Sequence, residues 1–292
     1  MLRFVTGRRA RRSIGAVVLA TILAMPLILP LAAAETVRFR SASITPTPLQ
    51  LRLARERGQP IREELGDEIA GELYRPPGDG PFPAVVSLHG CAGRSSPEVE
   101  DASGARYVAR GYVLLIVDSF GPRGVIHRCL GEESAAIDRT MDAYGALLYL
   151  AGSPFIDPER IAVIGFSQGA GAALSAVAPG GVETLFEHHF RAAVAYYPGC
   201  GYSRGAVSVP TLILIGELHD WTPAQACREM MDRRSGEGAP LRLVVYPGAY
   251  HAFNGLRDKP ETLFGHRLEY NEAADRAALE ETMAALRQAF ER

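Results

Sequence analysis

From residue 84 onward, hydrophobic and polar positions alternate between two rhythms. Short continuous apolar runs rich in Val, Ile and Leu are separated by segments whose apolar residues recur near helical spacing. Continuous runs of this length are typical of strands buried on both faces of a parallel sheet. We expect such strands at Ala84–Leu88, Val113–Val117, Ile161–Ile164, Ala192–Tyr196, Leu212–Ile215 and Leu241–Tyr246.

The segments between these runs, and the last one of the chain, are predicted to be helices. They are Val99–Arg110, Glu132–Ala151, Gln168–Ala178, Pro223–Arg233 and Glu272–Phe290. Alternation of strands and helices predicts an α/β fold with a mostly parallel, doubly wound sheet. Two earlier extended pieces, Thr36–Ser43 and Glu68–Tyr74, are expected to add antiparallel strands at one edge. No internal repeat or linker is visible, so residues 35–292 are expected to form a single domain.

The first 34 residues have the pattern of a secretory signal peptide. Five arginines precede the nearly uncharged run Ile14–Leu31, and Ala32–Ala34 follow it. This order predicts cleavage after Ala34 and a periplasmic or secreted protein without stable membrane insertion. A retained membrane anchor is the alternative, because the apolar run can just span a bilayer. Arg11 and Arg12 leave twin-arginine export open beside the Sec route.

Charge and composition exclude several classes of protein. The chain of 292 residues is 47% hydrophobic and 22% charged, which is not the composition of a disordered chain. Its net charge is -2, and residues 35–292 carry 26 basic against 33 acidic side chains. A mildly acidic body lacks the basic face that binding to nucleic acid needs. No metal is expected, because the four cysteines show no C-x-x-C spacing.

A candidate nucleophile lies where one predicted strand meets a helix. Ile161–Ile164 leads into Gly165-Phe166-Ser167-Gln168-Gly169, and a small-residue helix start follows. A G-x-S-x-G turn in this context is the nucleophile elbow, which presents a serine hydroxyl above the sheet. Its flanking glycines are needed because the turn is tight. The sequence therefore favours Ser167 as a catalytic nucleophile over a simple glycine-rich packing turn.

A base and an acid for this serine are expected later in the chain, since the fold orders its triad Ser, acid, His. Among the seven histidines His251 fits best, because it follows strand Leu241–Tyr246 on a loop. The loop after Leu212–Ile215 offers Glu217 and Asp220 as the acid. We prefer Asp220, which lies further into the loop, although a helix-capping role is the alternative. The adjacent His219 is expected to be an ordinary loop residue.

An acyl-transfer site also needs donors for the developing oxyanion. The backbone N–H of Gln168, directly after the candidate nucleophile, is one expected donor. The glycine-rich turn His89–Gly93 follows another strand end and supplies the second, which we assign to the backbone N–H of Cys91. Cys91 as a nucleophile is the competing interpretation, but it lacks the elbow.

Taken together, these motifs resemble the dienelactone hydrolase family of α/β-hydrolases. The resemblance covers nearly all of residues 35–292 and is carried by the segments Pro83–Gly90, Asp118–Gly124, Gly165–Gly169, Tyr197–Gly199, Gly216–Pro223 and Tyr246–Phe253. It implies the α/β-hydrolase fold, triad positions at Ser167, Asp220 and His251, and oxyanion positions at Cys91 and Gln168. It also places Arg123 near the family's arginine for a substrate carboxylate.

The chain departs from the founding members of the family. They use a cysteine nucleophile where Ser167 stands, and a glutamate where this chain has Gly90. The expected substrate is therefore a small carboxylic ester or lactone other than dienelactone. The expected mechanism forms an acyl-enzyme without any cofactor. A peptidase or amidase on the same fold, and a non-catalytic binding protein that keeps the scaffold, are the alternatives. The sequence says nothing about the oligomeric state.

Three further assignments concern the surroundings of this site. Arg123 is a candidate clamp for a substrate carboxylate, or an ordinary salt-bridge residue. Trp221, the only tryptophan, is a candidate wall of the substrate pocket or a packing residue. An oxidising compartment favours disulfides, with buried free thiols as the alternative. From the strands that they follow, we predict the pairs Cys91–Cys129 and Cys200–Cys227.

Overall fold

A computed structural model describes Met1 and residues 34–43, 48–58, 65–130, 137–201, 203–236, 238–255 and 259–291. The predicted signal peptide falls almost entirely outside the described residues. So do residues 132–136 of the helix predicted over Glu132–Ala151.

The described residues form an eight-stranded, mostly parallel sheet, as the apolar runs predict. Its order is β1-β2-β4-β3-β5-β6-β7-β8. β1 and β2 are antiparallel to each other, β2 is antiparallel to β4, and the remaining neighbours are parallel. The strands are β1 (Glu35–Arg40), β2 (Glu68–Tyr74), β3 (Phe82–Leu88), β4 (Val113–Asp118), β5 (Ile156–Phe166), β6 (Ala192–Tyr196), β7 (Thr211–Gly216) and β8 (Leu241–Tyr246).

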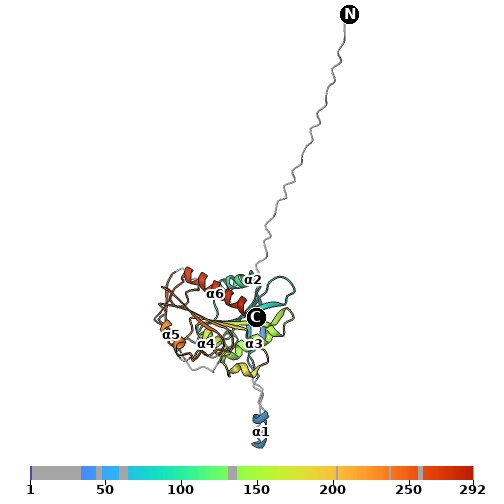
Figure 1. Ribbon diagram of the computed structural model, residues 1–292. Coiled ribbons are helices and arrows are strands. Elements are labelled where there is room, and N and C mark those ends of the chain that lie inside the picture. The colour runs from blue at the N-terminus through green and yellow to red at the C-terminus, as the bar shows by residue number, and fades with distance from the viewer. Residues whose placement is uncertain are drawn as a thin grey trace. The chain divides into compact units, whose positions relative to one another are not determined.

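Helices cover both faces of the sheet. α2 and α6 lie on one face, and α3 and α4 lie on the other (Figure 1). Because both faces are covered, the central strands are buried along their length, which explains their continuous apolar runs. The helices are α1 (Pro48–Glu56), α2 (Pro97–Val108), α3 (Arg139–Ala151), α4 (Gln168–Ala176), α5 (Ala224–Arg233) and α6 (Glu272–Phe290), with short 3₁₀ turns η1 (Gly121–Arg123) and η2 (Val182–Leu185).

Two elements that the hydrophobic pattern does not predict lie outside the main sheet. α1 is one, and the small hairpin of β9 (Glu261–Leu263) and β10 (His266–Leu268) is the other. The hairpin strands have three residues each, too short for a period to be visible in the sequence. Phe264 and Gly265 form the turn, both with positive φ, as two-residue hairpin turns require. Phe264 is an unusual residue for that position, so the turn has no sequence signal.

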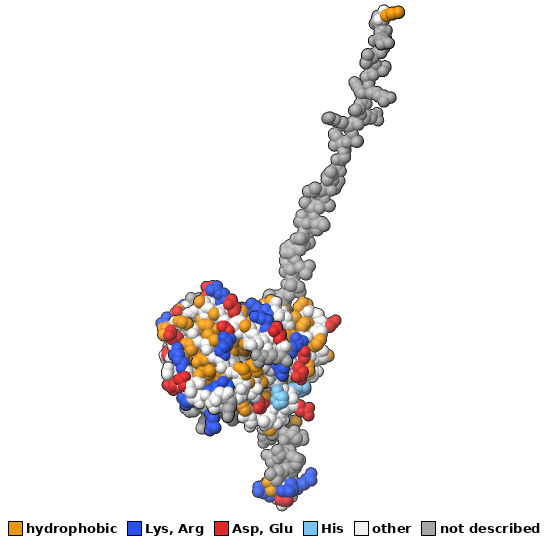
Figure 2. Space-filling view, in the orientation of Figure 1, with side chains coloured by type: hydrophobic (Ala, Val, Ile, Leu, Met, Phe, Trp, Pro, Cys, Tyr) orange, Lys and Arg blue, Asp and Glu red, His pale blue; other side chains and the backbone are white. Residues whose placement is uncertain are grey.

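Basic and acidic side chains are intermingled on the surface of the folded body. On the face seen in Figure 2, Arg and acidic side chains are interspersed over the body of the protein, and no broad basic patch gathers there. Interspersed charge gives this face no single-sign field of the kind that attracts a polyanion.

A very close backbone contact lies where α4 begins. A Cβ at Gly169 would lie 2.4 Å from the carbonyl oxygens of Leu88 and His89, and one at Gly165 would lie 2.0 Å from that of Gly169. β3, β5 and the start of α4 therefore meet without room for any side chain. Gly171, two residues along the same helix, has no atom within 4 Å of its Cβ position.

This contrast predicts opposite effects of two alanine substitutions in one helix. Gly169→Ala forces the backbones of α4 and β3 apart and should lower the free energy of unfolding by about 3 kcal/mol. Gly171→Ala fills open space and should raise it by up to about 1 kcal/mol, because alanine favours helix. Denaturant unfolding of both variants checks the prediction, and equal effects would contradict it.

Candidate active site

Ser167 occupies a strained turn between β5 and α4. Its backbone has φ 54° and ψ -116°, a conformation that non-glycine residues rarely adopt. Two hydrogen bonds hold the turn: the amide of Ser167 donates to the carbonyl of Tyr196 at 2.9 Å, and the amide of Ala170 donates to the carbonyl of Ser167 at 2.9 Å. The serine thus precedes the first turn of α4, whose amides and dipole favour negative charge.

The loop after β3 runs beside this serine. A Cβ at Gly90 would lie 3.6 Å from the Cβ of Ser167, so the missing side chain leaves the serine accessible from this side. Cys91 is tied to Cys129 by a disulfide, and its carbonyl accepts from the amide of Arg128 at 2.7 Å. Both predicted disulfides, Cys91–Cys129 and Cys200–Cys227, are present. The first one fixes the loop that carries the predicted oxyanion donor.

The buried guanidinium of Arg139 holds the loop that carries Cys91 through hydrogen bonds. The Arg139 guanidinium donates to the carbonyl of His89 at 2.5 Å and to Oε1 of Gln168 at 3.4 Å. Its Nε has no hydrogen-bond partner in the described part of the chain. Burial lowers the pKa of Arg139 to about 10, and this value still leaves the guanidinium charged at neutral pH. Arg139 thereby links the two segments that carry the predicted oxyanion donors.

His89 is a neutral structural partner in the same loop. Its Nε2 accepts from the amide of Ser119 at 3.3 Å, so its proton is on Nδ1, which lies 2.7 Å from the carbonyl of Gly90. Burial, with a smaller effect of the Arg139 charge, lowers the pKa of His89 to about 4. Sequence reasoning named His89 only as part of the glycine-rich turn and assigned its side chain no role, and it did not consider Arg139, which stands in no motif.

His251 is buried and contacts a second histidine. Its Nδ1 lies 2.5 Å from Nε2 of His219, and the two rings meet edge to face with centroids 4.4 Å apart. Tyr197, with φ 43°, packs edge-on against His251 at 4.7 Å. The histidine that sequence analysis treated as an ordinary loop residue therefore holds the position beside His251 that was expected for the acid.

Asp220 lies elsewhere, which corrects the expected triad. Its carboxylate accepts from the amide of Arg267 at 3.3 Å and lies 3.6 Å from Nδ1 of His266, and its side chain is 44% exposed. Adjacent residues of a turn point in different directions. The turn of residues 216–222 aims residue 219 inward, toward His251, and residue 220 outward, toward the β9–β10 hairpin.

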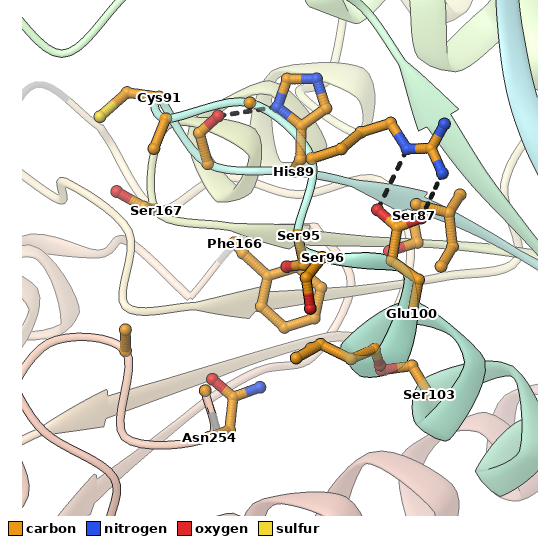
Figure 3. A pocket seen from close by; sticks show the side chains of 18 of the residues that line it. Ser87, His89, Cys91, Ser95, Ser96, Glu100, Ser103, Phe166, Ser167 and Asn254 are labelled. Carbon is orange, nitrogen blue, oxygen red and sulfur yellow. Dashed lines mark hydrogen bonds and ion pairs between the residues drawn. The ribbon is translucent and has the colours of Figure 1, made fainter. Parts of the chain in front are cut away.

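Ser167, His251 and Cys91 line one cavity of about 420 Å³. Figure 3 shows Cys91 and His89 above Ser167, with Ser87, Ser95, Ser96, Glu100 and Ser103 spread along the cavity away from it. Trp221 is part of the wall, stacked on His266 at 4.7 Å and 5.3 Å from the His251 ring, as its predicted place near the pocket requires.

The inner wall of the cavity carries an ion pair that sequence analysis did not identify. The buried Glu100, labelled in Figure 3, accepts from Arg94 at both of its carboxylate oxygens. Arg94 also lies 3.3 Å from Glu72. The serine hydroxyls around this pair make that end of the cavity polar, while Phe166 and Leu268 add apolar surface.

Arg123 does not reach the cavity, which corrects its assignment as a substrate clamp. Its guanidinium makes two hydrogen bonds to the carboxylate of Asp142, at 2.8 and 2.9 Å, and one to Asp67 at 2.7 Å. Burial tends to lower the pKa of Arg123, but the two carboxylates raise it above its usual value. The donors needed for a substrate carboxylate are used inside the fold, so the salt-bridge alternative holds.

Comparison with known proteins identifies a family that matches most of the chain. A model of the dienelactone hydrolase family matches residues 69–290. Esterase FrsA of Enterobacter sp. (strain 638) is 29% identical over 117 residues, which are 37% of this chain and 25% of that protein. The chain thus matches only a quarter of the length of that esterase. An uncharacterized protein of Mycobacterium tuberculosis is 27% identical over 222 residues, 70% of this chain and 73% of that protein.

Solved structures show the same fold at low sequence identity. A putative dienelactone hydrolase from Klebsiella pneumoniae superimposes with a TM-score of 0.61 at 19% identity, covering 87% of this chain and 99% of that one. Esterase 2 of Thermogutta terrifontis, in its apo form, gives a TM-score of 0.57 at 19% identity and covers 76% of this chain and 90% of its own.

The position of Arg123 predicts that its loss affects stability. Arg123→Met leaves the fully buried carboxylate of Asp142 without its partner and should lower the free energy of unfolding by about 4 kcal/mol. The double variant Arg123→Met/Asp142→Leu removes both charges and should recover most of this loss. Chemical denaturation of the two variants measures these changes in the free energy of unfolding. A single variant as stable as the unchanged protein would show that the pair does not matter.

Proposed function

The chain belongs to the dienelactone hydrolase family, and from this premise we propose that it is a serine hydrolase that cleaves small carboxylic esters or lactones. Ser167 is the nucleophile, His251 is the general base, and the amides of Cys91 and Gln168 bind the oxyanion. One observation carries the proposal. The strained turn at Ser167 opens into the same cavity as His251 and the loop of Cys91.

The proposed reaction has two halves. His251 takes the hydroxyl proton of Ser167 as the oxygen attacks the ester carbonyl, and then gives it to the departing alcohol. Water, deprotonated by His251, attacks the resulting acyl-enzyme and releases the acid and Ser167. In both halves the carbonyl oxygen becomes negative, and the two amides stabilise that charge. The buried Arg139 cation behind both donor segments favours the same charge.

Two alternatives share most of these features. A peptidase or amidase would use the same serine and histidine on an amide bond, and the cavity shape selects between them. A non-catalytic binding protein would keep the fold without turnover. Matched p-nitrophenyl ester and anilide substrates separate the first alternative. Reaction with a fluorophosphonate, a phosphorus reagent like the paraoxon that phosphorylates the Thermogutta esterase 2, separates the second.

We further propose that the protein is exported, with its signal peptide removed after Ala34. The support is that all four cysteines form disulfides, which persist in oxidising compartments. Among the described residues, no helix is long and apolar enough to cross a membrane. The proposed partner is a small ester or lactone, without nucleic acid and without a cofactor.

Ser167→Ala should abolish ester hydrolysis if this residue is the nucleophile. We expect a loss of at least about 10³-fold in kcat with p-nitrophenyl acetate, because the remaining site can only polarise the carbonyl. Peptide mapping after fluorophosphonate treatment should place the label on Ser167. A label on another residue, or turnover unchanged in the alanine variant, would rule out the assignment.

The disulfide of Cys91 predicts a selective effect on catalysis. Removing either disulfide by paired alanine substitution should lower the free energy of unfolding by about 4 kcal/mol, since the closed loops have similar lengths of 38 and 27 residues. Only Cys91→Ala/Cys129→Ala loosens the loop that carries an oxyanion amide, and it should lose about tenfold or more in kcat. Cys200→Ala/Cys227→Ala is the matched control, and an equal loss in both would argue against this role of the loop.

A further inference from the structure

The contact between His219 and His251 determines which nitrogen atoms of the two rings carry protons. Nδ1 of His219 accepts from the backbone amides of Trp221 and Thr222, at 3.2 and 3.0 Å. A nitrogen that accepts from two N–H groups carries no proton itself. Burial lowers the pKa of His219 to about 4, so the ring is neutral at pH 7 and has one proton. That proton is therefore on Nε2.

The proton on Nε2 points into the contact with His251. Nε2 of His219 lies 2.5 Å from Nδ1 of His251, with the Thr222 hydroxyl 3.2 Å from the same Nε2. A neutral His219 in this turn is thus the donor, and Nδ1 of His251 is the acceptor. A neutral His251 then has its own proton on Nε2, the nitrogen on the opposite side of its ring.

We propose that His219 replaces the acid of the Ser167–His251 pair and acts toward His251 as a hydrogen-bond donor rather than an acceptor, so that in the resting site His251 has to change tautomer before it can deprotonate Ser167. This inference rests on the proposed function of Ser167. His219 is a positioning residue, since it acts on the serine only through His251.

The tautomer matters because a general base needs a free lone pair toward the hydroxyl. A carboxylate accepts from Nδ1–H of His251 and leaves the lone pair of Nε2 free for the serine proton. A donor at the same place binds the lone pair of Nδ1, so that the proton of His251 is on Nε2. In serine proteases, replacing the triad acid by a donor amide lowers kcat by about 10⁴ with the geometry intact. His219 can accept from Nδ1–H of His251, as a carboxylate would, only if its own proton moves from Nε2 to Nδ1. That move breaks both hydrogen bonds from the Trp221 and Thr222 amides.

Among the described residues, the charges around His219 leave its ring neutral. The carboxylate of Asp220 raises the pKa of His219 slightly and His266 lowers it, but burial outweighs both. Asp220 itself is engaged with His266 and the β9–β10 hairpin. The phenol ring of Tyr197 lies against the face of the pair from the loop after β6.

The test compares carboxylates and amides of equal size at position 219. His219→Asp keeps an oxygen for the Trp221 and Thr222 amides and offers a second one as acceptor to His251, while His219→Asn offers an N–H there instead. His219→Glu and His219→Gln repeat the comparison with a longer reach. At least one carboxylate variant should exceed both its amide counterpart and the unchanged protein by about 10² in kcat, with KM unaltered.

The pH profile distinguishes this effect from a change in packing. A carboxylate beside His251 stabilises its protonated form, so the acid limb of kcat/KM should move to higher pH in the active carboxylate variant. Asp220→Asn, the matched change at the neighbouring residue, should leave kcat and the profile near those of the unchanged protein. If neither carboxylate exceeds its amide counterpart, or if Asp220→Asn alone abolishes turnover, the inference is wrong.

An NMR measurement on the unchanged protein tests the proton positions directly. Long-range ¹H–¹⁵N correlation spectra should show His219 and His251 both protonated on Nε2 at pH 7. Protonation of His251 on Nδ1 would overturn the inference whatever the variants do. A different result would contradict the proposed function, namely a Ser167→Ala variant that hydrolyses esters as fast as the unchanged protein does.

Discussion

The whole site depends on one close backbone contact, where the first turn of α4 crosses the end of β3. Gly169 lies against the carbonyls of Leu88 and His89, and no larger residue fits there. This contact places the strained turn of Ser167 directly beside the loop that follows β3. The serine and the amide of Cys91 come from segments 76 positions apart in the chain, and the close packing of the two backbones brings them together.

Electrostatics then gives this junction a preference for negative charge. Arg139 is buried beneath it as a cation with no direct carboxylate partner among the described residues, while the neighbouring Arg123 is neutralised by Asp142 and Asp67. A charged guanidinium in such a place is costly unless something opposite in sign is present. An oxyanion formed beside Cys91 and Gln168 is the negative charge that this arrangement favours. His89, held neutral by burial, adds no second positive charge to this junction.

The proposed site thus combines the strained turn of Ser167 and the disulfide-tied loop of Cys91 with an unusual partner for the proposed base, His251. In the turn of residues 216–222, an acceptor at residue 219 binds two backbone amides that precede α5, as the oxygen of a short acidic side chain also can. In this chain the Nδ1 atom of His219 does so instead, and the rest of the ring reaches on to His251. The same amide bonds that stabilise the turn therefore determine the tautomer of the base.

The sequence alone determined the fold and the position of the strained Ser167 turn, since both follow from local pattern. It left three disulfide pairings possible, and strand order favoured the one that the structure shows. Buried strands need apolar runs, the elbow needs glycines, and cysteines that follow neighbouring strand ends come close together. Tertiary structure alone decided which side chain faces His251 and what Arg123 binds. Asp220 and His219 are adjacent, so no spacing rule distinguishes them, and only the direction of the turn does. Asp142, the partner that removes Arg123 from the pocket, lies in a helix whose packing the sequence does not specify.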